Sequence, residues 1–302
     1  MCGIVGLYLK NPSMQPRLGA LFAPMLIEMT DRGPDSAGLA VYHDPAPDGR
    51  LKLVLFHPDE RFPWDGLARD LAEALDVDAR IAHRATHAVL VTEAAESDVT
   101  AWLAAEDGAL QVMSVGRVIE IYKETGLPEE VAARFAVPAM AGTHAIGHTR
   151  MATESAVTTA GSHPFSTGLD LCLVHNGSLS NHNWLREQLE RRDGIHCRTE
   201  NDTEVAAAFL TSRLRHGRSL HEALEDSIEA LDGFYTFCVG TAEGFAVLRD
   251  PIACKPAVLA ETDDWVAMAS EYRALTRLPG VEHARVWEPA PATVYSWAQG
   301  SA

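Results

Sequence analysis

The chain begins Met1-Cys2-Gly3-Ile4-Val5-Gly6-Leu7-Tyr8-Leu9, an apolar stretch rich in β-forming residues. A strand that starts at the second residue is unusual, because chain ends are poorly ordered unless a sheet holds them. Removal of Met1, which a small second residue generally permits, would give Cys2 both a thiol and a free α-amine. That amine, with an ordinary pKa of about 7.7 to 8.0, can accept the thiol proton near neutral pH. The alternative is that Cys2 is a small buried residue of an edge strand.

Composition argues against several classes of protein. The 302 residues include 25 Lys and Arg against 42 Asp and Glu, a net charge of −17 that argues against nucleic-acid binding. The sequence has no run of ~18 apolar residues, so no membrane span is expected. The five cysteines form no C-x-x-C pair, and the 13 histidines show no persuasive ligand spacing. We therefore expect a cytoplasmic protein without a metal site.

The hydrophobic periodicity predicts an α+β protein. Short apolar strands outnumber helices at both ends of the chain, which favours largely antiparallel sheets with helices on their outer faces. Between these ends, residues from about 47 to 141 alternate between strand and helix and resemble a small α/β insertion. Within it, residues 118–123 are expected to form helical turns. The sequence thus predicts one domain, 1–302, that carries this insertion.

Three polar segments follow apolar runs and contain residues suited to binding or catalysis. Arg150 has a planar guanidinium that suits a carboxylate ligand or, equally, a surface ion pair. Asn176 and Gly177 offer a side-chain amide and a backbone N–H that can converge on an oxyanion, or they form a simple turn. Asp202 precedes an apolar helix and suits an ammonium ligand, although it or Asn201 equally suits a helix cap.

Taken together and in this order, these segments resemble those of the class II glutamine amidotransferases, which are N-terminal-nucleophile hydrolases. The matches cover about residues 1–45 and 142–275. They are Met1-Cys2-Gly3-Ile4, Arg32-Gly33-Pro34-Asp35-Ser36, Gly147-His148-Thr149-Arg150, His175-Asn176-Gly177, Asn201-Asp202-Thr203-Glu204, Asp232-Gly233-Phe234, Arg249-Asp250-Pro251 and Lys255-Pro256. The chain departs from the family pattern at Ala253, where glycine is usual, and at Asn201, where serine is usual. The resemblance implies a four-layer αββα sandwich with the small α/β insertion.

The resemblance also implies roles for individual residues. The implied catalytic residues are Cys2, Asn176 and Gly177, and the implied substrate-binding residues are Arg150, Thr153 and Asp202. Cys2 would attack the side-chain amide of glutamine. Arg32 and Asp35 look like supporting residues near the nucleophile, or equally like a structural ion pair. Residues 160–165, which include His163, resemble the glutamine loop that closes over substrate, or they form an ordinary exposed connection.

Family members with complete biosynthetic activity carry a second, synthase domain that this sequence lacks. We therefore expect a subunit of a hetero-oligomer that forms a glutamyl thioester, ammonia and glutamate, and passes ammonia or the glutamyl group to a partner synthase. The pattern is most similar to stand-alone subunits related to glutamate synthase, including that of N-methylglutamate synthase. No cofactor is expected in this chain, and a flavin would belong to the partner. The alternatives are a non-catalytic amino-acid-sensing or scaffold subunit and a self-contained glutaminase.

Overall fold

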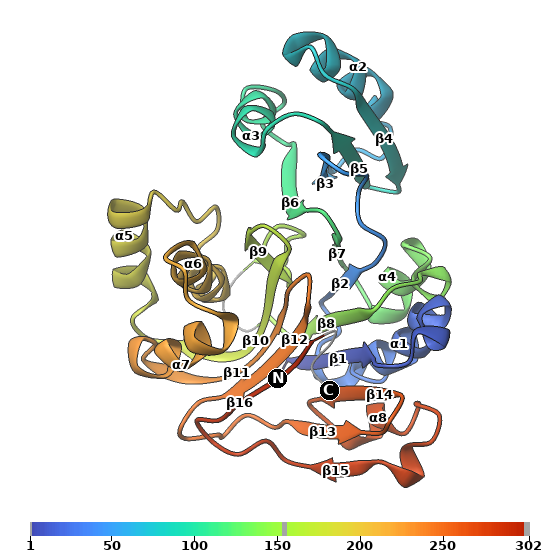
Figure 1. Cartoon of the computed structure of the whole chain (residues 1–302), viewed down its shortest axis with the longest axis vertical. Helices are drawn as coiled ribbons and strands as arrows, with labels where there is room; N and C mark the ends of the chain where they lie inside the picture. Colours follow the sequence, from blue (N-terminus) through green and yellow to red (C-terminus); the bar gives the residue numbers. More distant parts are fainter. Residues whose placement is uncertain (1, 153–155, 299–302) are drawn as a thin grey trace.

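Two large antiparallel sheets lie against each other in the computed structural model, which describes residues 2–152 and 156–298 (Figure 1). The seven-stranded sheet has the order β15-β13-β14-β1-β8-β2-β7. Its strands are β1 (Gly3–Leu9), β2 (Ser36–Tyr42), β7 (Ile119–Thr125), β8 (His144–Arg150), β13 (Val258–Glu261), β14 (Trp265–Ala269) and β15 (Arg285–Trp287). The five-stranded sheet has the order β16-β12-β11-β10-β9. Its strands are β9 (Phe165–Gly168), β10 (Leu171–Leu179), β11 (Gly233–Gly240), β12 (Gly244–Arg249) and β16 (Val294–Ala298).

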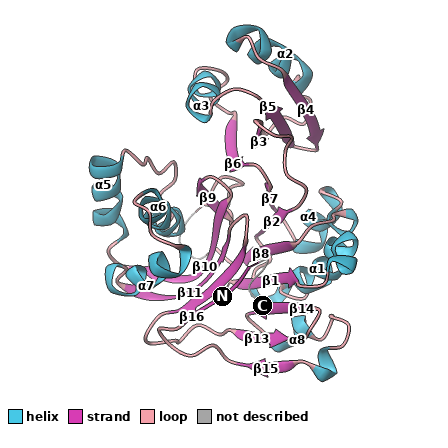
Figure 2. Cartoon of the chain, viewed as in Figure 1, coloured by secondary structure: helices cyan, strands magenta, loops and turns pink. Residues whose placement is uncertain are grey.

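Helices cover the outer faces of both large sheets (Figure 2). The seven-stranded sheet packs against α1 (Leu18–Ile27), α4 (Pro128–Arg134) and α8 (Tyr272–Leu275). The five-stranded sheet is covered by α5 (His182–Asp193), α6 (Asp202–Arg215) and α7 (Leu220–Ala230). Short 3-10 helices occupy Pro12–Arg17, Thr30–Arg32, Val137–Ala139 and Val281–His283. The expected α+β class and antiparallel sheets with outer helices are confirmed.

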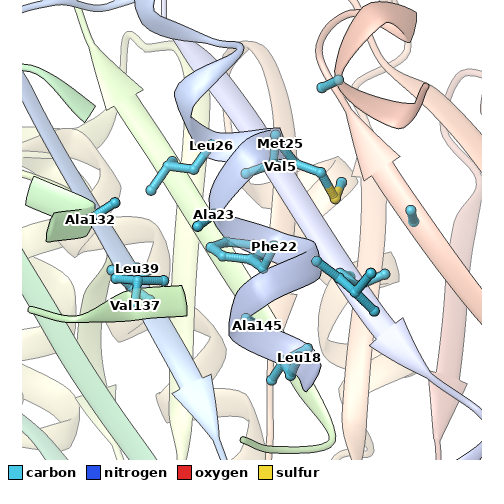
Figure 3. Close-up of a cluster of buried hydrophobic side chains, with 14 of the residues drawn as sticks. Val5, Leu18, Phe22, Ala23, Met25, Leu26, Leu39, Ala132, Val137 and Ala145 are labelled. Carbon is cyan, nitrogen blue, oxygen red and sulfur yellow. The ribbon is translucent and has the colours of Figure 1, made fainter. Parts of the chain in front are cut away.

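Strand β1 is apolar along its whole length because both of its faces are buried. Val5, with the alternate residues that follow it, packs against α1, where Phe22 and Leu26 lie (Figure 3). Ile4 and Tyr8 point the other way, into the cluster between the two large sheets. Since successive side chains of a strand alternate between its faces, one unbroken apolar run serves both cores. β1 is therefore a central strand, paired with β8 on one side and β14 on the other.

A smaller, four-stranded sheet has the order β4-β5-β3-β6 and stands apart from the other two in Figure 1. It consists of β3 (Leu51–Phe56), β4 (Ala79–Arg84), β5 (His87–Thr92) and β6 (Gln111–Gly116), with α2 (Trp64–Leu75) and α3 (Glu96–Ala104). These elements share a hydrophobic cluster of their own, which includes Trp64 and Leu71. One face of this sheet thus has a core of its own, whereas Val54, Phe56 and Met113 on the other face pack into the cluster between the two large sheets.

The helical turns expected at residues 118–123 are wrong. This segment belongs to β7, which pairs with β2 from Ile119 opposite Tyr42 to Thr125 opposite Ser36. Ile119 and Ile121 alternate with polar residues, but a run this short fits a helix nearly as well as a strand. Pairing with a distant strand decides the outcome, and it places β7 at the edge of the seven-stranded sheet.

None of the helices within 2–152 and 156–298 is long and apolar enough to cross a membrane. In the same ranges, no group of three or more His, Cys, Asp or Glu residues is arranged to hold a metal ion.

Candidate functional site

Cys2 lies immediately before β1, and its carbonyl oxygen is held from two sides. The oxygen accepts hydrogen bonds from Arg32 Nε at 3.0 Å and from Asn176 Nδ2 at 3.1 Å. The next residue, Gly3, has no room for a side chain, since a Cβ there would lie 2.7 Å from Met29 Cβ. Cys2 is therefore fixed against both large sheets, and the residue is partly exposed.

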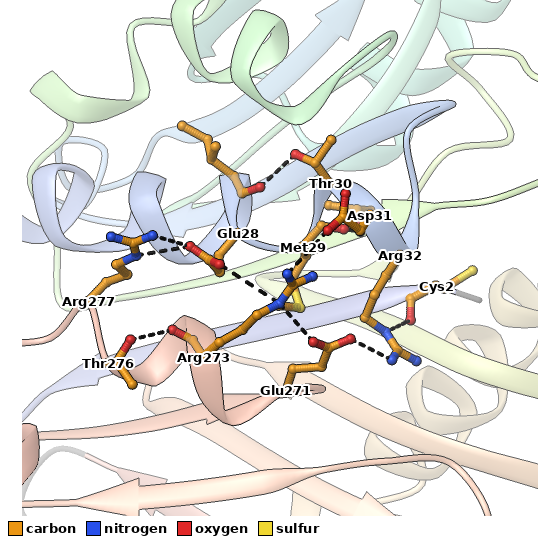
Figure 4. A network of polar contacts seen from close by, with 12 residues as sticks. Cys2, Glu28, Met29, Thr30, Asp31, Arg32, Glu271, Arg273, Thr276 and Arg277 are labelled. Atoms are coloured by element: carbon orange, nitrogen blue, oxygen red, sulfur yellow. Dashed lines mark hydrogen bonds and ion pairs between the residues drawn. The ribbon is translucent and has the colours of Figure 1, made fainter.

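Arg32 reaches Cys2 from the 3-10 helix that follows α1, and a charge network holds its guanidinium (Figure 4). Arg32 Nη1 donates to Glu271 Oε1 at 2.9 Å, and Glu271 Oε2 lies 2.8 Å from Arg273 Nε. Arg273 in turn donates to Asp31 at 3.2 Å. Arg32 therefore lies beside Cys2, with Glu271 as its carboxylate partner.

Asp35 supports a different part of the site. Its Oδ2 accepts a hydrogen bond from the backbone N–H of Ala152 at 2.8 Å, and its own N–H donates to the carbonyl of Arg150 at 3.1 Å. Asp35 therefore fixes the backbone where the chain leaves β8. Thr153, the other residue expected near this point, lies outside the described residues.

Asn176 and Gly177 lie in β10, beside Cys2. Each amide side chain has two N–H donors, and Asn176 uses one of them on the carbonyl of Cys2. Gly177 has a φ of 154°, and a Cβ at this position would lie 1.9 Å from the carbonyl oxygen of Phe234. Only glycine fits there. Because both residues lie within β10, this Asn-Gly pair is part of a strand and does not form a two-residue turn.

Arg150 ends β8 and is buried. Its Nη1 donates to the carbonyl of Gly161 at 3.2 Å and lies 3.5 Å from that of Ala156. The buried guanidinium thus contacts the loop that contains His163.

Asp202 is the first residue of α6, and the capping role belongs to its neighbour. Asn201 Oδ1 accepts from the N–H of Thr203 at 2.9 Å, which leaves the carboxylate of Asp202 to face β10. Asp202 Oδ2 accepts from the N–H of Leu179 at 2.9 Å, and Oδ1 lies 3.6 Å from His175 Nδ1. Burial opposes ionisation, but His175 and the Leu179 N–H outweigh it and keep the pKa of Asp202 below its ordinary value.

Replacing Asp202 with Asn removes this charge and keeps the shape. We expect D202N to lose about 1 kcal/mol of unfolding free energy at neutral pH, because an ionised acceptor makes stronger hydrogen bonds than a neutral one. The folded pKa is depressed, so the advantage is complete above the unfolded pKa of about 3.9 and is lost as pH falls through the folded value. Urea unfolding of wild type and D202N, above the unfolded pKa and below the folded pKa, measures the difference in unfolding free energy. An equal difference in unfolding free energy at both pH values would contradict a stabilising, ionised Asp202.

His163 is buried and connects its loop to the rest of the site. Its Nε2 lies 2.7 Å from Thr203 Oγ1, which lies 3.0 Å from His175 Nδ1. Its ring stacks on that of His148 at 3.9 Å. Burial, together with these neighbours, holds the pKa of His163 well below its ordinary value, so the ring is neutral. The hydroxyl of Thr203 also lies 3.5 Å from Asp202 Oδ1, and since its single proton serves one acceptor, at least one of the two histidines must donate to it.

The structure also brings in residues to which the sequence assigned no role. Thr203 and His175 lie within recognised motifs, but nothing in the sequence indicates that one hydroxyl joins two imidazoles. Glu271 is 239 residues from its partner Arg32, and a single acidic residue at that distance carries no signal.

Ala253 departs from the glycine expected by resemblance, yet its backbone has the conformation that glycine favours, with a φ of 52°. The neighbouring turn is held by Arg249, which donates to the carbonyls of Ala253 and Lys255. Arg249 thus holds this turn with alanine at a position where the backbone conformation favours glycine.

Known proteins to which the chain is similar include ones described as glutamine amidotransferases or amidophosphoribosyltransferases. Residues 148–277 match a family model described as a glutamine amidotransferase domain. The chain is 59% identical over 298 residues to the glutamine amidotransferase-like protein GlxB of Rhizobium meliloti, covering 98% of each chain. It is 33% identical over 167 residues to an amidophosphoribosyltransferase of Synechocystis, covering 53% of this chain and 34% of that enzyme.

A solved structure shares the fold. It is glutamine phosphoribosylpyrophosphate amidotransferase from B. subtilis, with a TM-score of 0.57 and 20% identity. The match covers 100% of this chain, which spans 50% of that one.

Proposed function

The chain belongs to the class II glutamine amidotransferases, and on this premise we propose that Cys2 is a catalytic nucleophile that releases ammonia from the side-chain amide of glutamine. The observation that carries the proposal is the position of Cys2. Its carbonyl accepts hydrogen bonds from Arg32 and Asn176, which supports a thiol and an α-amine, freed by loss of Met1, that act next to the Asn176–Gly177 pair.

The proposed reaction has two stages. The thiol of Cys2 gives its proton to the α-amine, directly or through water, and the sulfur attacks the amide carbon. The remaining N–H of the Asn176 side chain and the N–H of Gly177 would stabilise the oxyanion. The ammonium form of the amine protonates the leaving nitrogen, ammonia departs and a glutamyl thioester remains. The amine then activates water, which hydrolyses the thioester to glutamate and regenerates the thiol.

A free amino acid needs one cationic and one anionic partner, with neutral donors at the reacting carbon. We assign the α-carboxylate to Arg150 and Thr153 and the α-ammonium to Asp202. Arg150 supports this assignment because it is buried at the end of β8 and contacts the loop that contains His163. Asp202 supports it because its carboxylate stays ionised beside β10.

Replacing Arg150 with Met is expected to raise the KM for glutamine about 10- to 100-fold, the cost of one charge-assisted pair. Steady-state kinetics of glutamate release measures this change. The matched control is Arg69→Met, at an exposed position of α2, which should leave KM unchanged. An R150M protein with the wild-type KM would contradict the carboxylate assignment.

We further propose that the helices and the two large sheets form the αββα sandwich of N-terminal-nucleophile hydrolases, as one domain, 1–302, with an insertion of about 47–141. Three hydrophobic clusters support this arrangement: one on each outer face and one between the sheets. The separate core of the four-stranded sheet supports the insertion.

The remaining part of the proposal concerns the acceptor. We propose that ammonia or the glutamyl group passes to a partner synthase subunit, such as N-methylglutamate synthase or a split glutamate synthase, and that any flavin belongs to that partner. Copurification with a flavin-containing synthase subunit is the expected result. A purified chain that turns over glutamine fully by itself and binds no such subunit would favour a self-contained glutaminase.

Intact-mass analysis combined with an ammonia assay tests the proposed function. We expect a mass that lacks Met1 and equal amounts of ammonia and glutamate from glutamine. Retention of Met1, with glutamine binding but no ammonia release, would contradict the proposal and support an amino-acid-sensing subunit.

A further inference from the structure

Lys123 is a buried lysine that the proposed reaction does not use. It lies on the edge strand β7 and is only 4% exposed. Its ammonium donates to the backbone carbonyls of Ala160 at 3.1 Å, Ser162 at 2.8 Å and Pro164 at 3.2 Å. An ammonium has three N–H donors, and all three of those of Lys123 bind alternate residues of one loop.

The ring of Phe165 completes this arrangement. Lys123 Nζ lies 4.5 Å from the centre of that ring, close enough for a cation–π contact. On the neighbouring strand β2, a Cβ at Gly38 would lie 2.1 Å from the carbonyl oxygen of His163. The loop thus lies directly on the backbone of the sheet, and Lys123 is the cation that holds it there.

The next residue of β7 holds the preceding part of the same loop. Thr159 donates its hydroxyl to Glu124 Oε1, and Thr86 donates to the other oxygen, Oε2, at 3.1 Å. Because Thr86, in the turn between β4 and β5, binds one oxygen of Glu124, the carboxylate is fixed where its other oxygen binds Thr159. Lys123 and Glu124 therefore bind successive parts of the 159–164 segment.

We propose that Lys123 and Glu124 are positioning residues that hold the 159–164 loop in the conformation that binds glutamine. The inference rests on the proposed function. His163 links the loop to the substrate site, because its imidazole contacts Thr203 beside the ammonium-binding Asp202. A shift of the loop would move His163 and, with it, the residues around the substrate backbone.

The protonation state of Lys123 gives the proposal a distinctive signature. Burial lowers the pKa of Lys123 to about 7, with Glu204 opposing this effect and Arg198 adding to it. His163 of the loop and His87 of β5 also face this charge, and both are neutral because burial lowers their pKa values. Above neutral pH, the amine would keep two N–H donors for three carbonyls, so the loop would be held less firmly.

The test compares Lys123→Met with Lys52→Met, a second buried lysine that contacts His43 and Glu120 away from the loop. For K123M we expect the KM for glutamine to rise about 10- to 100-fold, the range expected for a small misplacement of a binding segment. Alkylation of Cys2 by iodoacetamide, which does not need the loop, should keep its wild-type rate. K52M should keep the wild-type KM. A wild-type KM in a folded K123M protein would overturn the proposal.

The pH dependence distinguishes positioning from general stability. We expect the wild-type KM to rise as pH increases through about 7, and the K123M value to stay flat. If K123M does not fold, Glu124→Gln, which weakens the bond to Thr159 and keeps the shape, becomes the test, and a wild-type KM in that variant would overturn the proposal. If the wild type releases no ammonia, the proposed function fails separately. Calorimetric titration with glutamine then compares K123M with K52M, and equal affinities would overturn the role of Lys123.

Discussion

Replacing Cys2 with alanine is expected to lower glutamine hydrolysis by roughly 10⁴-fold or more, because the reaction loses its nucleophile. The loss should appear in kcat, since the proposed substrate-binding residues lie elsewhere. The fold should persist, because Arg32 and Asn176 bind the backbone carbonyl of Cys2 and not its side chain. Release of ammonia and glutamate measures the activity, and thermal unfolding measures the fold.

Cys254→Ser is the matched control, because Cys254 is an exposed cysteine with no assigned role, and its activity should equal that of the wild type. In an assembled complex, C2A should abolish glutamine-dependent synthesis and leave ammonia-dependent synthesis intact. A folded C2A protein that hydrolyses glutamine at the wild-type rate would remove the basis of the proposed mechanism.

Asn176→Ala should produce the second largest effect, a fall in kcat of about 10²- to 10³-fold, which is typical for loss of one oxyanion donor. Two contacts disappear together, since the same amide also binds the carbonyl of Cys2. Asn176→Asp should be similarly impaired, because it replaces the donor with an acceptor of the same shape. KM should change little in either variant, since the oxyanion forms only during the reaction.

Asn183→Ala on the exposed side of α5 provides the control for this substitution and should be fully active. An N176A enzyme that keeps its kcat and loses only affinity for glutamine would show that Asn176 binds the ground state. Other N–H donors would then have to stabilise the oxyanion.

Much of the fold follows from sequence patterns that are local. The apolar run after Cys2 predicts a strand, and the structure shows that it is a central one whose burial on both faces explains the lack of polar alternation. The motif around Arg150 ends β8 and the motif around Asp202 begins α6, whereas Asn176 and Gly177 lie within β10. The first two motifs lie at the end of β1 that carries Cys2, and the Asp202 motif joins them through the contact between Thr203 and His175.

Features that depend on distant partners could not be read from the sequence. The 118–123 segment has too few residues to distinguish a helix from an edge strand, and only its pairing with β2 makes it a strand. Lys123 gains its significance from that pairing, which faces it toward the loop carbonyls. The contact between Arg32 and Glu271 likewise joins two elements that nothing local connects.

The most direct test of the account is to treat the mature protein with a glutamine-analogue electrophile and map the labelled peptide. We predict a single modification on the sulfur of Cys2, in a chain that has lost Met1, with protection by excess glutamine. Labelling of Cys254 or Cys197 instead, or the same labelling of Cys2 in the presence and absence of glutamine, would contradict the assignment of Cys2 as the nucleophile of a glutamine site.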